Sequence, residues 1–260
     1  MISGVPQGSV MGSLLFIMFI NDLSKCCDDN SRIFIFADDA KCFSRIDSYL
    51  DCVRLQATLT SIENWSVRWQ LPLSINKCKV MYFHCRSTLL KFQYCVFNCV
   101  LPSVDSISDL GVIFSCDLSF NMQVDKLCSK ARCRAAMILR SFQSRDCKLL
   151  FRAFTVYVRP ILEYCSNVWS PYRLVDIRRI ESVQRFFTKR LRGLKDMTYV
   201  ERLECLNADS LECRRMKTDL GMYHKILHGL VDIEPDSFFQ VRNGCTRSNG
   251  LSLTLEDPEL

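Results

Sequence analysis

The chain has 260 residues, of which 34 are basic and 28 acidic, giving a formal net charge of +6, and 48% are hydrophobic. This balance is typical of a globular protein and argues against a disordered chain. The length fits one large domain or two smaller ones. The longest apolar run, residues 14–20, is far shorter than the roughly 18 residues of a membrane span, so no membrane partner is expected.

The 16 cysteines are scattered without a regular framework, and no secretory signal precedes them. Free thiols in a reducing compartment are therefore expected, which places the protein inside the cell, in the nucleus or cytoplasm, and not among secreted proteins. One group, Cys205, Cys213, His224 and His228, raises the possibility of zinc, since the two histidines are four residues apart on a predicted helix. The cysteine spacing is not that of a compact zinc module, which favours structural cysteines and surface histidines.

The chain opens with a loop that contains Gly4, Pro6, Gln7, Gly8 and Ser9. Small and amide side chains let a backbone approach a ligand closely, so this loop is a candidate binding element. The apolar segment that follows predicts a buried helix ending near residues 21–23.

The next predicted element is a β-hairpin over residues 32–43. Apolar, β-favouring residues lead into a turn with the adjacent carboxylates Asp38 and Asp39, and a second run leads out. Two neighbouring carboxylates repel each other, and a divalent cation is one reason to place them together. The alternative is that both are ordinary turn residues.

Residues 48–69 have apolar positions at helical spacing, and Pro72 ends that predicted helix. Lys77 lies in a predicted turn that leads into a strand. Lys79, two residues later, is the alternative candidate for a functional lysine in this turn. Two short β-like runs, 94–100 and 108–114, come next, and helical patterns dominate from about residue 118. The fold class expected from this order is α+β.

Charge is concentrated in residues 126–195, which hold 17 basic and 4 acidic residues, a net charge of +13. Basic helices with interleaved aromatic residues are typical of a protein that binds a nucleic-acid backbone. The alternative is a basic surface that serves solubility alone. A helix is predicted over residues 177–194, and its candidate backbone-binding residues are Arg178, Arg179, Arg185, Lys189, Arg190 and Arg192.

The loop over residues 3–16 and the segment 36–39, in this order and at this separation, resemble the reverse transcriptases of non-LTR retrotransposons of the LINE and jockey-like class. Segments 159–172, 180–190 and 199–215 are similar to the downstream part of the same elements, so the resemblance covers nearly the whole chain. It implies a partial polymerase palm over residues 1–115, a basic helical thumb or connection over 116–195, and a C-terminal helical region with a frayed tail over 196–260.

The resemblance implies RNA-directed DNA polymerase activity, a nucleotidyl transfer that two divalent cations, Mg²⁺ or Mn²⁺, would assist. It makes Asp38 a metal ligand, Asp39 its supporting partner, and Lys77 a donor near the phosphates of the incoming nucleotide. Phe36 would pack under the primer end, and the opening loop, Gly4 to Ser9, would hold template and nucleotide. The implied partners are an RNA template, a DNA primer and deoxynucleoside triphosphates. Gly111, in segment 108–112, would lie where the primer end is gripped.

The sequence departs from the family at Phe36, where tyrosine is more common, and at Ser13, which replaces proline. The family also has a first palm strand with another metal-binding Asp, and basic fingers, upstream of the opening loop. Because the chain begins at Met1, it is expected to be N-terminally truncated and impaired in polymerisation. The alternative is a non-catalytic remnant that binds RNA or DNA. A group II intron maturase is a weaker third reading, which the long basic region disfavours.

Overall fold

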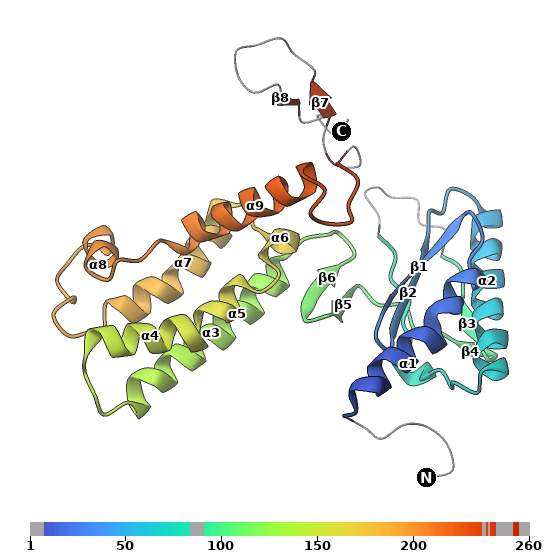
Figure 1. Ribbon diagram of the computed structural model, residues 1–260, viewed down its shortest axis with the longest axis horizontal. Coiled ribbons are helices and arrows are strands. Elements are labelled where there is room, and N and C mark those ends of the chain that lie inside the picture. The colour runs from blue at the N-terminus through green and yellow to red at the C-terminus, as the bar shows by residue number, and fades with distance from the viewer. Residues whose placement is uncertain (1–7, 84–90, 236–237, 239, 243–251, 255–260) are drawn as a thin grey trace. The chain divides into compact units, whose positions relative to one another are not determined.

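The computed structural model describes residues 8–83, 91–235, 238, 240–242 and 252–254. Contacts divide the chain into two compact units, of which unit 1 comprises residues 1–107 and 115–118, and unit 2 comprises residues 108–114 and 119–260. Figure 1 shows helices and short strand pairs in the chain, in agreement with the predicted α+β class. The predicted boundary after residue 115 falls in a hairpin that contributes to both units, whereas the predicted boundary after residue 195 falls inside unit 2.

Unit 1 is built around the hairpin of β1 (Ser31–Phe36) and β2 (Asp39–Ser44). The antiparallel register pairs Phe36 with Asp39 and leaves a two-residue loop, Ala37 and Asp38. Because residues alternate between the two faces of a strand, Ile33, Ile35 and Cys42 share one face of the hairpin. These residues pack on the hydrophobic cluster of unit 1, which fixes the register.

The helices of unit 1 are α1 (Val10–Ile20), the 3₁₀ helix η1 (Asn21–Cys26), α2 (Tyr49–Arg68) and the 3₁₀ helix η2 (Ile75–Lys77). The rest of that cluster comes from α1, η1 and α2, and from Leu71 and Leu73 in the segment before η2. The predicted helix over residues 48–69 is confirmed as α2, which begins with a capping box formed by Ser48 and Asp51. Ile20, Leu23, Ile62 and Trp65 form the buried centre of the cluster.

Each of the two predicted β-like runs turns back on itself as a hairpin. The first forms β3 (Cys95–Val96) and β4 (Cys99–Val100), and the second forms β5 (Ser106–Asp109) and β6 (Val112–Ser115). The loops between these strands have positive φ at Phe97, Asn98, Leu110 and Gly111. This left-handed conformation at both loop residues closes a tight hairpin, and it is unusual for Phe and Leu.

Unit 2 is a set of seven helices within the described residues. They are α3 (Asn121–Ser141), α4 (Cys147–Tyr157), α5 (Arg159–Glu163), α6 (Ser166–Trp169), α7 (Leu174–Thr188), α8 (Tyr199–Cys205) and α9 (Leu211–Leu227). The helix predicted over residues 177–194 begins three residues earlier and ends six residues earlier, as α7. Residues 189–193 form turns, and Gly193 adopts a φ of 81° there.

The core of unit 2 is formed by side chains from α3, α4, α5, α6 and α7. Phe154, Trp169 and Phe187 have no exposed surface at all. Burial of each such side chain stabilises the fold by about 1.5–3 kcal/mol. Val112 of β6 belongs to the same core, so the β5–β6 hairpin is anchored to unit 2.

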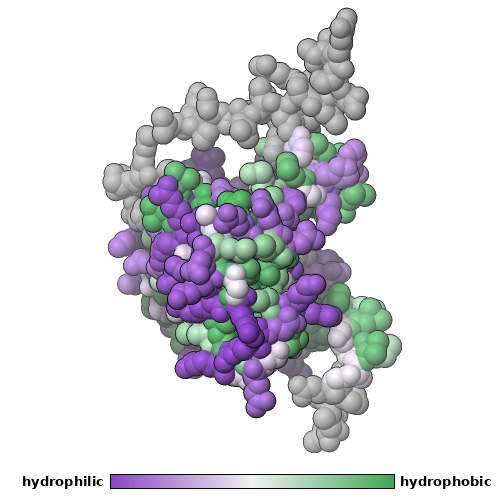
Figure 2. Space-filling view, turned by 90° about the vertical axis from the view of Figure 1, so that its left-hand side faces the viewer, coloured by the Kyte–Doolittle hydropathy of each residue, from purple (hydrophilic) through white to green (hydrophobic). Residues whose placement is uncertain are grey.

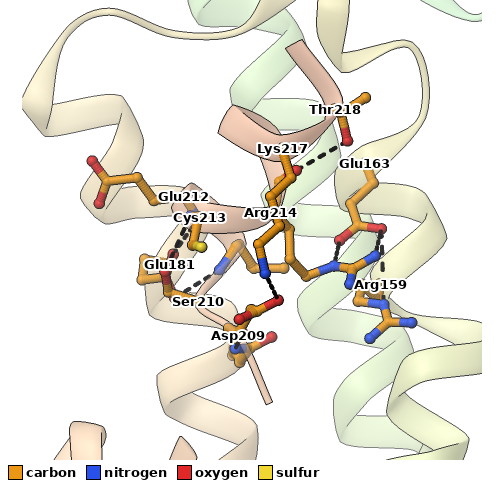
Figure 3. A network of polar contacts seen from close by, with 12 residues as sticks. Arg159, Glu163, Glu181, Asp209, Ser210, Glu212, Cys213, Arg214, Lys217 and Thr218 are labelled. Carbon is orange, nitrogen blue, oxygen red and sulfur yellow. Dashed lines mark hydrogen bonds and ion pairs between the residues drawn. The ribbon is translucent and has the colours of Figure 1, made fainter. Parts of the chain in front are cut away.

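A network of polar contacts holds α9 in unit 2 (Figure 3). Arg214 of α9 donates to both carboxylate oxygens of Glu163 on α5. Lys217 contacts Asp209 at 2.6 Å, and Ser210 caps the helix by accepting from the backbone N–H of Cys213 at 3.1 Å. The amphipathic α9 is thus held at its first turns through charged side chains.

Two short strands, β7 (Gln240–Arg242) and β8 (Ser252–Thr254), pair antiparallel near the C-terminus. The segment predicted as a frayed tail, residues 243–260, therefore contains a strand at residues 252–254. Its other residues lie outside the described part of the chain.

Candidate active site

The tip of the β1–β2 hairpin presents the two predicted carboxylates to solvent. Asp38 is the second residue of the loop, and Asp39 is the first residue of β2, opposite Phe36. Both aspartates are exposed. Ala37 has a φ of 51°, a left-handed conformation that is uncommon for alanine.

The two faces of the hairpin differ sharply. On the inner face, burial raises the pKa of the Cys42 thiol to about 12, so this thiol stays protonated as part of the core. On the outer face, Phe34 and Phe36 are each 62% exposed, and Phe34 stacks on Phe43 with ring centroids 5.1 Å apart. The register places Asp39 on this outer face beside Phe36. The outer face of the hairpin therefore carries exposed aromatic rings and carboxylates, while its inner face packs on the hydrophobic cluster of unit 1.

Only part of the predicted opening loop belongs to the described residues. Gly4, Pro6 and Gln7 lie outside them. Gly8 adopts a φ of 85°, and the Ser9 side chain accepts from the Gly12 N–H at 3.1 Å as the N-cap of α1. The loop thus ends at a well-formed helix start.

The expectation that α1 is buried is wrong for most of its surface. Ile20 is the one buried residue of this helix, while Val10 is 92% and Met18 68% exposed. The helix is apolar on all sides, and within unit 1 only the stripe that contains Phe16 and Ile20 contacts the hydrophobic cluster.

Lys77 ends η2, and both Lys77 and Lys79 are exposed. The predicted strand after them is reduced to one bridge between Val80 and Ser103. Leu71 and Leu73 pack on the same cluster as the β1–β2 hairpin, so the Lys77 turn and the hairpin share one anchoring core.

Asp38 and Asp39 are the described carboxylates that suit a divalent cation at the hairpin. Two exposed carboxylates fit Mg²⁺ or Mn²⁺, which keep several water and phosphate ligands. No group of three or more His, Cys, Asp or Glu side chains converges within the described residues. His224 and His228 lie together, with ring centroids 4.2 Å apart, but Cys205 and Cys213 do not complete a zinc site with them. The described cysteines are free thiols.

A second candidate element is the basic surface along α7 and the turns after it. Arg178, Arg185 and Lys189 are exposed and spaced seven and four residues apart, which places them on one side of the helix. Arg179 lies outside this stripe, and its guanidinium forms ion pairs with Asp125 and Asp176. Figure 2 looks onto the left-hand side of Figure 1, and hydrophilic residues cover most of the ungreyed surface there.

The turns after α7 surround a hollow of about 690 Å³. Its lining residues are Lys189, Arg190, Leu191, Arg192, Gly193 and Lys195. The guanidinium of Arg190 lies 3.7 Å from the centroid of the Phe186 ring and donates to the Phe186 carbonyl at 3.0 Å, which fixes its direction. A hollow lined by four cations is suited to phosphate groups.

No helix in the described part of the chain is long and apolar enough to cross a membrane.

One supporting contact of unit 1 is not predictable from local sequence. The indole N–H of Trp65 donates to a carboxylate oxygen of Asp22 at 2.7 Å, joining α2 to η1 behind the hairpin. The residues are 43 positions apart, so neither periodicity nor spacing indicates the pair.

Trp65→Phe should lower the free energy of unfolding of unit 1 by about 2 kcal/mol, because a partly buried hydrogen bond to a carboxylate is lost. Urea unfolding followed by circular dichroism measures this change. Trp69→Phe is the matched control, since Trp69 is 38% exposed, and it should cost less than about 1 kcal/mol. Equal losses in the two variants would show that the Asp22 contact is unimportant.

Comparison with known proteins finds one matching family model and several relatives. The family model described as reverse transcriptase (RNA-dependent DNA polymerase) matches residues 2–114, which include the whole β1–β2 hairpin. An uncharacterized protein of Caenorhabditis elegans is 28% identical over 149 residues, covering 52% of this chain and 75% of that relative. No solved structure matches the chain significantly.

Other relatives are polymerases of mobile elements. The RNA-directed DNA polymerase from mobile element jockey of Drosophila funebris is 22% identical over 246 residues, covering 90% of this chain and 26% of the relative. The probable RNA-directed DNA polymerase from transposon X-element of Drosophila melanogaster is 24% identical over 198 residues, covering 74% of this chain and 22% of the relative. The chain thus spans about a quarter of the length of these polymerases.

The resemblance inferred from the opening loop and the paired aspartates is confirmed by these matches. Over residues 2–114, the chain is similar to the reverse transcriptase (RNA-dependent DNA polymerase) family.

Proposed function

We propose that this chain is part of the RNA-directed DNA polymerase of a non-LTR mobile element, with the β1–β2 hairpin as its catalytic element. The observation that carries this proposal is the exposed pair Asp38 and Asp39 on a hairpin anchored from one side, within the segment that matches the family. The substrates would be an RNA template, a DNA primer and deoxynucleoside triphosphates.

Asp38 and Asp39 would hold a divalent cation, Mg²⁺ or Mn²⁺, which neutralises phosphate charge and makes the primer hydroxyl a better nucleophile. Asp39 lies beside Phe36 on the outer face, so a primer end resting on the Phe36 ring would be close to the carboxylates. Lys77 is exposed and could donate a proton to the leaving pyrophosphate.

Unit 2 would bind the backbone of the template–primer duplex. Exposed Arg178, Arg185 and Lys189 form one charged stripe, and the hollow after α7 adds Arg190 and Arg192. Arg179 would contribute less to phosphate binding, because its guanidinium is already paired with two carboxylates. Phosphate contacts of this kind position a duplex without reading its sequence.

The experiment for this proposal is single-nucleotide incorporation on an RNA template annealed to a DNA primer, with protein in excess and Mn²⁺ or Mg²⁺ present. We expect slow incorporation that requires both template and metal, because two carboxylates supply only part of the ligand set of a two-cation site. Efficient synthesis would contradict the expectation of an impaired polymerase. Incorporation without a template would contradict the proposed function.

A second candidate function is nucleic-acid binding without catalysis, which the +13 charge of residues 126–195 favours. The double variant Arg185→Gln/Lys189→Gln should weaken duplex binding and lower the slope of log K against log salt by about 2. Lys225→Gln, which removes a positive charge from the exposed side of α9, is the control and should leave the slope nearly unchanged. Binding that depends on the α7 pair while incorporation is undetectable would favour this second function.

A further inference from the structure

Two cysteine side chains meet at the inner face of the β1–β2 hairpin. Cys27 directly follows η1, and Cys42 lies on β2 opposite Ile33, on the face that packs on the hydrophobic cluster of unit 1. The Cys27 side chain is a hydrogen-bond partner of the Cys42 thiol. Both residues are half-buried, so the fold holds the two thiols together and solvent still reaches the pair.

Other thiols of the chain have different partners. The Cys26 thiol donates to the Ser61 carbonyl on α2 at 3.7 Å, although Cys26 is adjacent to Cys27 in the sequence. A thiol that meets a carbonyl oxygen forms only a weak hydrogen bond, whereas two thiols that meet can also be joined covalently. The chemistry open to the Cys27–Cys42 pair therefore differs from that of Cys26.

The backbone on both sides of the pair is fixed by a tight turn and by the strand ladder. The Ser31 N–H donates to the Asp28 carbonyl at 3.2 Å, and the Ser31 hydroxyl donates to the Asp28 carboxylate at 2.6 Å. The ladder pairs Ser31 with Ser44, two residues after Cys42. This reversal of the chain places Cys27 beside the strand that carries Cys42. Because the backbone is already ordered there, joining the two sulfur atoms costs little further chain entropy.

We propose that Cys27 and Cys42 form a reversible disulfide when the protein meets a low-molecular-weight disulfide such as oxidised glutathione. The Cys27 thiolate attacks one sulfur of glutathione disulfide, which forms a mixed disulfide and releases one glutathione. Cys42 then attacks the Cys27 sulfur, and its proton passes to the second glutathione as that leaves. In total, two electrons and two protons pass from the cysteine pair to glutathione disulfide, which becomes two glutathione thiols.

The order of the two steps follows from the surroundings of the thiols. Burial, together with the neighbouring Cys27, raises the pKa of the Cys42 thiol to about 12. Since the thiolate is the attacking form in thiol–disulfide exchange, Cys42 is a poor first nucleophile. We therefore expect Cys27 to react first and Cys42 to close the bridge in a slower second step.

The bridge would join the end of η1 to the strand that carries Asp39, which lies three residues before Cys42. A disulfide stabilises a fold largely by restricting the unfolded chain, and the loop closed here has about 15 residues. The disulfide would thus act as a brace on the inner face of the hairpin, while Asp39 and Phe36 occupy the outer face.

The test exposes the folded, reduced chain to oxidised glutathione, blocks the remaining thiols with iodoacetamide and maps disulfides by mass spectrometry of unreduced peptides. We expect a glutathione adduct at Cys27 first and the Cys27–Cys42 disulfide afterwards. Hydrogen exchange of the β1–β2 amides should then slow by at least about tenfold, and dithiothreitol should restore the original rate.

Single substitutions separate this pair from the other thiols. Cys42→Ser should leave the glutathione adduct on Cys27 without a bridge, and Cys27→Ser should leave Cys42 unmodified. Cys26→Ser is the matched control, because Cys26 is also half-buried and is the neighbour of Cys27. This control should retain both the bridge and the slower hydrogen exchange.

Glutathione attached only to exposed cysteines, such as Cys99 and Cys133, would overturn the inference, and so would a bridge from Cys42 to Cys26. A Cys27–Cys42 disulfide that leaves hydrogen exchange of the hairpin unchanged would contradict its role as a brace. None of these results depends on nucleotide incorporation by the reduced chain, which tests the proposed function separately.

Discussion

Asp38→Asn should reduce metal-dependent nucleotide incorporation by roughly 10²- to 10³-fold, since removal of one group that stabilises transition-state charge typically costs that much. The substitution keeps the size of the side chain and removes the negative charge that would bind the cation. Because Asp38 is exposed in a loop, the fold of unit 1 should be unaffected. Single-turnover incorporation with Mn²⁺ measures the effect.

Asp29→Asn is the matched control, since Asp29 is exposed near the opposite end of the same hairpin. It makes the same charge change and should alter incorporation by less than a factor of about two. Incorporation that persists in Asp38→Asn, or that falls equally in Asp29→Asn, would mean that the hairpin tip is not the catalytic element.

Glu181→Gln should lower the free energy of unfolding of unit 2 by about 3 kcal/mol. The buried Glu181 carboxylate accepts from the N–H groups of Leu211 and Glu212, each at 3.2 Å, at the start of α9. It also accepts from the hydroxyl of Tyr199, whose pKa is raised by burial and by this contact. An amide supplies one acceptor and would point an N–H₂ group at a backbone N–H, so one donor would lose its partner.

Chemical denaturation of the wild type and the variant measures this loss, and hydrogen exchange of the α9 amides locates it. Glu204→Gln on the exposed side of α8 is the control and should change stability by less than about 0.5 kcal/mol. A similar stability for Glu181→Gln and the wild type would show that this carboxylate is not the anchor of α9.

The sequence allowed a correct prediction of the β1–β2 hairpin and of α2 because each shows its own periodicity. Ile33 and Ile35 alternate with exposed residues, and the apolar positions of α2 recur at helical spacing. The position of the aspartate pair at the hairpin tip could be predicted because the two strands leave only a short turn between them. A hairpin tip is expected to display its side chains away from the sheet, and both carboxylates are exposed in the structure.

The short hairpins were missed for a physical reason. Phe97 and Leu110 adopt positive φ although neither residue favours it, so each segment was predicted as one β-like run and its tight turn was missed. Tertiary contacts, such as the Tyr164 hydroxyl on the Leu110 carbonyl, stabilise a turn that local propensity opposes. Asn98 and Gly111 were the available turn signals. Contacts such as Glu181 with the start of α9 join positions 30 residues apart and leave no local signal.

The most direct measurement is paramagnetic broadening of backbone amide signals by Mn²⁺, with the RNA–DNA primer–template and a deoxynucleoside triphosphate present. We expect selective broadening at residues 37–40, lost in Asp38→Asn/Asp39→Asn and retained in Asp29→Asn. Broadening centred elsewhere in the chain, or unchanged by the double substitution, would contradict the claim that the paired aspartates hold the catalytic cation.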